Sequence, residues 1–258
     1  MSAPAPKNIS AISPDVMNYT NGPVLLAQTG SFFAVALLTV CIRSYSRRFI
    51  VNSFGKDDWA MLFALACAVV CFASYTYQVT LGVGRYVAVV QSDQASYQQI
   101  LKARQIFQCI PIQAAWETRL QPPPFGTGNA KCFSGKAFGQ IGLFNGIINI
   151  ATDVLLAVIP IPLIWTLRMT IASRVSLTVV LGLGVFVAIA GIMRQASMGA
   201  TFTDSEPWVH DTYAIWNFIE LDTGIIAASL PATKPLLSQL CQIAKSLTKG
   251  TKMSGYCR

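Results

Sequence analysis

Charged residues are scarce in this 258-residue chain: Asp, Glu, Lys and Arg together make up only 12% of it. An average soluble domain carries about 25% charged residues, so this chain has too few to cover a surface in water. It is also 53% apolar, with a mean hydropathy of +0.50, which disfavours a disordered chain. The net charge of +8 therefore indicates contact with membrane lipid rather than nucleic acid.

Lys and Arg are absent from five long apolar runs, each close to the 20 or so residues that a helix needs to cross a bilayer. The sequence thus predicts an all-α, polytopic bundle of five transmembrane helices. The apolar stretch 106–116 is too short to cross and is expected to be interfacial or re-entrant. The five predicted spans are Val24–Ile42, Trp59–Gly84, Phe138–Trp165, Val175–Met193 and Thr212–Leu230.

The chain divides by composition into three parts. Residues 1–23 hold several prolines and no apolar core, which is unlike a signal peptide, so the first span is expected to act as a retained signal anchor. Residues 24–240 form the predicted transmembrane domain. Residues 241–258 form a basic tail that is predicted to lie in the cytoplasm.

The basic residues of the loops predict the orientation of the bundle. One set of connections holds 11 of the 19 basic residues and only two acids, Asp57 and Asp58, whereas the other set holds eight basic residues and six acids. This difference places the N-terminus outside and the tail in the cytoplasm, in the plasma membrane or an endomembrane. The two N-glycosylation sequons, at Asn8 and Asn18, lie in the external segment, and Asn8 is the preferred acceptor.

The seven cysteines form no CxxC pair, and the single histidine, His210, has no partner nearby, so no metal site is expected. Cys109 and Cys132 both fall on the predicted outer side. Because disulfides persist in an oxidising compartment, we predict a bond between these two cysteines.

Three acids fall inside predicted spans, where an ionisable group costs about 3 kcal/mol on insertion scales and suggests a functional site. Asp153 lies near the middle of its span, and Glu220 and Asp222 bracket the middle of theirs. Glu220 and Asp222 point to different sides of one helix, so only one is expected to approach Asp153. Arg194 is placed at the outer end of its helix, so no basic residue is expected to neutralise the acids.

Two interpretations of these acids remain open. They form a proton or cation relay or a polar ligand pocket, or they belong to an interhelical hydrogen-bond network with Asn145, Asn149 and Asn217. The structural interpretation is favoured, and no spacing motif supports a catalytic carboxylate pair. Gly142 and Gly146 indicate close helix packing.

A series of short motifs recurs in a specific order along residues 24–240. This order resembles the fungal rhodopsin-like domain of integral membrane proteins, the family of the satratoxin-cluster membrane protein, and is similar to the transmembrane part of fungal pathogenicity receptors. The motifs are Asp57–Trp59, Leu81–Arg85, Phe107–Pro111, Ala114–Trp116 with Cys132, Asn149–Asp153, Ile159–Trp165, Arg194, and Trp216 to Pro235 with Glu220 inside it.

The resemblance implies seven helices, so two spans are missing. The family pattern places its third and fourth spans where Ala103 is followed almost at once by Ile106, and a gene model that skipped coding sequence is the favoured explanation. A retinal Schiff base needs a lysine in the last helix. Thr212–Leu230 contains no lysine and Lys234 lies beyond Pro231, so retinal is not expected. No other cofactor is predicted.

The resemblance implies a receptor-like or accessory role in fungal signalling or secondary metabolism, with an intracellular signalling partner. A homo-oligomer is a further expected partner state, because a second copy would fill the groove left by the missing spans. Two alternatives stay open: a proton or small-solute transporter, and a membrane-embedded, cyclase-like enzyme that uses the buried acids. Of these classes, an enzyme is the less expected.

Overall fold

The computed structural model describes residues 14–104, 109–110, 113, 118–120, 127–132, 135–159, 171–201, 204 and 206–247. The chain forms two compact units, which we describe one at a time. Unit 1 comprises residues 1–28, 71–148 and 195–215, and unit 2 comprises residues 29–70, 149–194 and 216–258.

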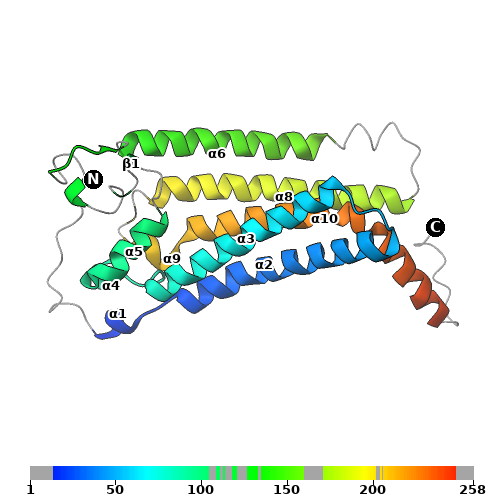
Figure 1. Cartoon of the computed structure of the whole chain (residues 1–258), viewed down its shortest axis with the longest axis horizontal. Helices are drawn as coiled ribbons and strands as arrows, with labels where there is room; N and C mark the ends of the chain where they lie inside the picture. Colours follow the sequence, from blue (N-terminus) through cyan, green and yellow to red (C-terminus); the bar gives the residue numbers. More distant parts are fainter. Residues whose placement is uncertain are drawn as a thin grey trace. The chain divides into compact units, whose positions relative to one another are not determined.

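Long helices dominate the described part of the chain (Figure 1). Their apolar stretches leave few polar side chains to compete for the backbone hydrogen bonds, and in a bilayer the backbone must satisfy those bonds within the helix. The long helices are α2 (Gly22–Tyr45), α3 (Lys56–Leu81), α6 (Gly135–Val158), α8 (Ile171–Thr201) and α10 (Thr212–Leu247).

Four of the five predicted spans are long and apolar enough to cross a membrane: 15–50, 56–81, 139–158 and 178–199. The fifth is present as α10 but is less apolar, because Glu220 and Asp222 lie within it. Large apolar side chains are exposed along the helices, among them Phe63 at 72% and Phe144 at 67%. Lipid-facing helices show such surfaces, whereas monomeric soluble proteins rarely do. The chain is thus a helical, multi-pass membrane protein.

Unit 1 brings together three segments that the charge pattern assigns to one side. The backbone N–H of Asn21 donates to Gly84 O at 2.8 Å, and Gly84 N–H donates to Trp208 O at 2.9 Å. The amide of Asn21 also donates to Val209 O at 3.0 Å. The N-terminal segment, the connection after α3 and the connection before α10 are therefore joined by hydrogen bonds.

Short elements complete unit 1. The helices α4 (Val87–Ser92), α5 (Gln94–Arg104) and α9 (Pro207–His210) lie close together (Figure 1), and the carboxylate of Glu206 accepts from Val87 N–H at 2.7 Å. The strands β1 (Cys109–Ile110) and β2 (Lys131–Cys132) form an antiparallel pair. Most of the stretch 106–116, predicted to be interfacial or re-entrant, lies outside the described residues. The remaining short helix is α1 (Pro14–Asn18).

Two glycines shape the turn that ends α3. Gly82 has φ +126° and Gly84 has φ +97°, conformations that glycine adopts without steric cost. A Cβ at Gly84 would lie 2.6 Å from the backbone nitrogen of Gly22. Close approach of two backbone segments therefore requires glycine at this position.

In unit 2 the first turn of α3 is capped by its own acid. Asp58 accepts from the backbone N–H of Gly55 at 3.0 Å and from Arg43 Nε at 3.0 Å. The first bond is half of a capping box, and the acid also suits the positive end of the helix. Arg43 in turn donates through Nη1 to Ala228 O at 2.8 Å. The three residues join α2, α3 and α10.

The apolar packing of unit 2 also joins these three helices. Ala36, Val40, Ala68 and Ile225 form a buried cluster, with Phe33 among the partly buried side chains packed against it. Small side chains on α2 and α3 allow these helices to approach α10 closely. This core fixes the face of α10 on which Ile225 lies.

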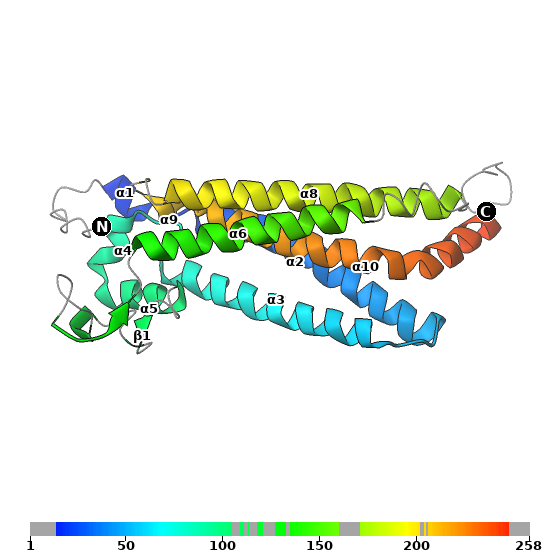
Figure 2. The ribbon, with the colours of Figure 1, turned by 90° about the horizontal axis from the view of Figure 1, so that it is seen from above.

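Small residues also shape the contact between α6 and α8 (Figure 2). In unit 1 a Cβ at Gly142 would meet Met198, and one at Gly146 would meet Gln195. In unit 2 a Cβ at Gly184 would lie 3.1 Å from the Cβ of Ala157. The predicted close packing at Gly142 and Gly146 is confirmed.

Candidate functional site: an acid–arginine cluster

The candidate site is an ion pair between α8 and α10, which run side by side in unit 2 (Figure 2). Arg194 Nε lies 3.0 Å from Glu220 Oε2, and the two side chains are only 11% and 15% exposed. Arg194 also donates through Nη1 to Asn217 Oδ1 at 3.2 Å. One face of α10 thus supplies two partners for a single buried guanidinium.

Asp153 reaches the same place from α6. A Cβ at Gly191 of α8 would lie 3.3 Å from Glu220 Oε2 and 3.6 Å from Asp153 Oδ2. The missing side chain at Gly191 therefore leaves room for both acids beside one turn of α8. We call Asp153, Gly191, Arg194 and Glu220 the acid–arginine cluster.

The charges of the acid–arginine cluster do not balance by number, because two carboxyl groups face one guanidinium. Asp153 Oδ2 is buried and has no hydrogen-bond partner among the described residues. An unsatisfied buried acceptor costs roughly 1–3 kcal/mol. Asp153 Oδ2 is therefore an acceptor that a further hydrogen-bond donor would stabilise.

The expectation that no basic residue neutralises the acids is wrong. Arg194 does not end its helix, because α8 continues to Thr201, about two turns further. The guanidinium is consequently inside the helix pair, where it meets Glu220. The length of an apolar run does not reveal how far a helix continues beyond it.

Glu220 and Asp222 do face different sides of α10, as helix geometry requires. Asp222 is fully buried, and neither of its oxygens has a hydrogen-bond partner in the part of the chain that the structure describes. It lies one turn before Ile225, a member of the apolar cluster with Ala36. Of the two acids, only Glu220 thus lies beside Asp153.

The predicted asparagine network is present in part. Asn217 binds Arg194, as described above. Asn149 is half-buried on α6, one turn before Asp153, whereas Asn145 is exposed, and neither side chain has a hydrogen bond with the described residues. The sequence does not single out Gly191, although its position three residues before Arg194 places both on one helix face.

The predicted disulfide involves the two-stranded sheet of unit 1. The register of β1 and β2 pairs Cys109 directly with Cys132. Paired antiparallel residues have Cα atoms about 4.5–5.5 Å apart, within the range that a disulfide spans. The bond between these two cysteines stays a prediction, which the backbone register favours.

Two other predictions concern glycosylation and retinal. Asn18 is exposed at the end of α1, whereas Asn8 lies outside the described residues. The helix α10 continues through Pro231 to Leu247, so Lys234 lies on the same helix, beyond the predicted span. The basic tail predicted for 241–258 accordingly begins within a helix.

Comparison with known proteins gives a family match and three relatives. A family model described as the fungal rhodopsin domain matches residues 95–239. A protein named SAT4 family membrane protein, from Emericella nidulans, is 25% identical over 150 residues, which cover 58% of this chain and 35% of the relative. No solved structure matches the chain.

The other two relatives are named after biosynthetic clusters. Wortmanamides biosynthesis cluster protein C, from Talaromyces wortmannii, is 28% identical over 48% of this chain and 31% of its own length. Polyenoic acids biosynthesis gene cluster protein Ba17b, from Metarhizium anisopliae, is 27% identical over 52% of this chain and 37% of its own length. The chain spans about a third of the length of the curated relatives that it matches.

Proposed function

Since the chain belongs to the fungal rhodopsin domain family, whose model matches residues 95–239, we propose that it is a receptor-like or accessory membrane protein of secondary metabolism. Two relatives are named after clusters that make wortmanamides and polyenoic acids. In this proposal the acid–arginine cluster recognises a polar group of a fungal metabolite inside the bundle.

The observation that carries the proposal is the buried, unpartnered oxygen of Asp153 beside the Arg194–Glu220 pair. A hydroxyl, ammonium or amide N–H of a ligand would donate to Asp153. A carbonyl or carboxylate of the same ligand would accept from Arg194. Ligand sites typically combine an apolar wall with a few such polar groups.

The test is a chromosomal Asp153→Asn substitution in the native host, with metabolite profiling by mass spectrometry. The side chain keeps its size but loses its charge and one acceptor oxygen. We expect the Asp153→Asn strain to show the same metabolite pattern as a strain that lacks the gene. The amount of membrane-inserted protein should equal that of the wild type. Asp204→Asn, at an exposed position, is the matched control and should leave the pattern unchanged.

Two outcomes would contradict the proposal. If deletion of the gene leaves secondary metabolites unchanged, the role in secondary metabolism is wrong. If the deletion changes them but Asp153→Asn does not, the acid–arginine cluster is not the recognition site.

A proton or small-solute transporter is the second candidate, and Asp222 favours proton transport. A fully buried carboxyl without a partner is the kind of group that relays protons in transporters. Proteoliposomes with an internal pH-sensitive dye test this function. A transporter would acidify the lumen under an inward proton gradient and lose that activity in Asp222→Asn, whereas a receptor-like protein would show no flux in either form.

We also propose that the protein acts with an intracellular signalling partner, at the predicted cytoplasmic side that carries 11 basic residues. A basic surface attracts an acidic partner through long-range electrostatics. A homo-oligomer is proposed as well, since a second copy would fill the groove that the two missing spans of the family pattern leave. The mass of the protein in nanodiscs, measured by mass photometry, distinguishes one copy from two.

A further inference from the structure

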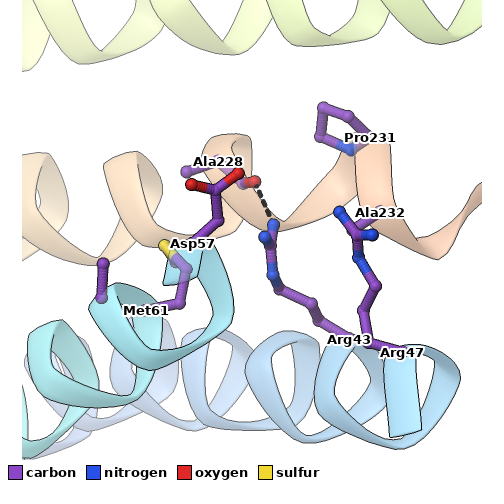
Figure 3. A pocket seen from close by; sticks show the side chains of 8 residues that line it. Arg43, Arg47, Asp57, Met61, Ala228, Pro231 and Ala232 are labelled. Atoms are coloured by element: carbon purple, nitrogen blue, oxygen red, sulfur yellow. Dashed lines mark hydrogen bonds between the residues drawn. The ribbon is translucent and has the colours of Figure 1, made fainter. Parts of the chain in front are cut away.

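An open pocket of about 470 Å³ lies in unit 2, where α2, α3 and α10 meet (Figure 3). The π-helix η2 (Ser46–Ile50), which follows α2, supplies one wall and the first turns of α3 supply another. The pocket is lined by Arg43, Arg47, Asp57, Ala60, Met61, Ala228, Pro231 and Ala232.

Two donor nitrogens of Arg43 are already bound by neighbouring residues. Its Nε donates to Asp58 at 3.0 Å and its Nη1 donates to Ala228 O at 2.8 Å, the bond drawn in Figure 3. Both Arg43 and Asp58 are buried. The positive charge of Arg43 is therefore compensated by the buried carboxylate of Asp58.

Arg47 has unused donors. Its Nε lies 3.8 Å from Asp58 Oδ1, which is too long for a hydrogen bond, and this buried nitrogen has no hydrogen-bond partner among the described residues. The side chain is 29% exposed and lines the pocket. A guanidinium with free N–H groups is well suited to a phosphate, which accepts two parallel hydrogen bonds.

Asp57 provides the opposite charge on the α3 wall (Figure 3). Its carboxylate is exposed and forms no ion pair with any residue that the structure describes. The pocket thus offers the Arg47 guanidinium, which pairs with Asp58 only at 3.8 Å, and the Asp57 carboxylate, which has no ion-pair partner among the described residues. This arrangement complements a zwitterion that carries a phosphate and an ammonium.

The surroundings of the pocket indicate a lipid. Trp59, Phe63 and Phe49 are 68%, 72% and 67% exposed on the adjoining α3 and η2 surfaces, and Phe54 packs edge-on against Trp59 with ring centroids 5.8 Å apart. Exposed Trp is typical of the depth at which lipid headgroups lie. Asp57 stands in the first turn of a helix long enough to cross the membrane.

We propose that this pocket binds the headgroup of phosphatidylethanolamine, with the phosphate on Arg47 and the ammonium on Asp57. The acyl chains then run along the exposed apolar face of α3. Phosphatidylcholine has the same charges, but its quaternary nitrogen has no N–H to donate to Asp57. Phosphatidylglycerol has the phosphate but no cation.

Native mass spectrometry of the full detergent-purified chain tests the proposal with these three lipids. We expect phosphatidylethanolamine to bind about tenfold more tightly than either other lipid, since a charge-assisted hydrogen bond is worth roughly that factor. Arg47→Gln and Asp57→Asn should each weaken its binding about tenfold. Arg48→Gln, at an exposed neighbour that does not line the pocket, should leave binding unchanged.

Several results would overturn the proposal. Equal binding of the three lipids would exclude a headgroup-selective site, and so would equal losses in Arg48→Gln and Arg47→Gln. Displacement of the lipid by an equal concentration of soluble glycerophosphoethanolamine would show that the ligand is a free phosphate compound. If Arg47→Gln does not fold, Asp57→Asn, at an exposed position, tests the proposal alone. Binding about tenfold weaker than that of the wild type supports the site, and unchanged binding overturns it.

Discussion

Single buried charges determine much of the energetics of this bundle. The Arg194–Glu220 pair is more than four-fifths buried on each side, and the membrane offers no water to solvate a charge that is left behind. Removing one partner therefore costs far more than the pair itself contributes. The same reasoning applies to Arg43 and Asp58, at 7% and 2% exposure.

Glu220→Ala should lower the free energy of unfolding by about 3 kcal/mol, because Arg194 stays buried without its acid. The measurement is unfolding by SDS titration in bicelles. The double variant Arg194→Met with Glu220→Leu removes both charges and should regain most of the loss. A single variant as stable as the wild type would contradict a buried ion pair at this position.

Asp58→Asn and Asp57→Asn form a matched pair of neighbouring changes. Asp58 holds Arg43 and caps α3, so its loss should destabilise the protein by about 3 kcal/mol. Asp57 is exposed, so its substitution should change stability by less than about 0.5 kcal/mol. Similar effects of the two changes in thermal unfolding would refute the assignment of Arg43 to Asp58.

At the scale of helices and turns, the hydropathy of consecutive residues predicts accurately where the apolar helices lie. It predicts less accurately where those helices end. The runs beginning at Val24 and Trp59 became α2 and α3, since a bilayer-length apolar segment has no other stable backbone conformation in lipid. The helix α8 extends beyond the predicted span, because residues after Arg194 are helical but less apolar. Helix ends depend on capping and tertiary contacts rather than hydropathy.

Gly84→Ala should destabilise the protein by about 1–3 kcal/mol, since its φ is +97° and the new Cβ would clash with the backbone of Gly22. Gly182→Ala is the control: apart from its own helix backbone, no described atom lies within 4 Å of its Cβ position in α8. That change should be neutral or stabilising by up to about 1 kcal/mol, as alanine favours helix. Thermal unfolding in detergent distinguishes the two.

The disulfide between Cys109 and Cys132 is tested by peptide mapping without reductant. We expect one cross-linked peptide containing both cysteines, because the strand register sets them opposite each other. Cys109→Ser should lower stability by about 3 kcal/mol, and reduction of the wild type should reproduce that loss. Recovery of both cysteines as free thiols from the secretory pathway would contradict the prediction.

At the scale of the whole molecule, the charge counts in the loops predict the orientation of the bundle. The segments assigned to one side, around Asn21, Gly84 and Trp208, are joined by hydrogen bonds in unit 1. In unit 2, Arg43 and Asp58, at the two ends of one loop assigned to the other side, are joined to each other, and Arg43 also binds Ala228 O near the end of the last predicted span. The grouping of the loops thus agrees with the alternation of spans that the sequence predicts.

An external N-terminus predicts that Asn8 carries an N-glycan. Treatment with an endoglycosidase should shift the protein to lower apparent mass, and Asn8→Gln should abolish that shift. Asn18→Gln should leave the shift in place, since Asn18 stands only four residues before α2, close to the membrane. An unglycosylated wild type that instead accepts a glycan in an engineered tail would reverse the orientation.

The sequence by itself determined the helical class, the approximate spans, the grouping of loops and the family resemblance, because hydropathy, loop charge and motif order are properties of consecutive residues. Only the tertiary structure decided that Arg194 pairs with Glu220 beside Asp153, and that Gly191 makes room for both. It likewise decided that Arg43 binds Asp58, and that Arg47 and Asp57 line the pocket beside this pair. These pairings depend on which helix faces meet, and that follows from side-chain packing between residues far apart in the chain.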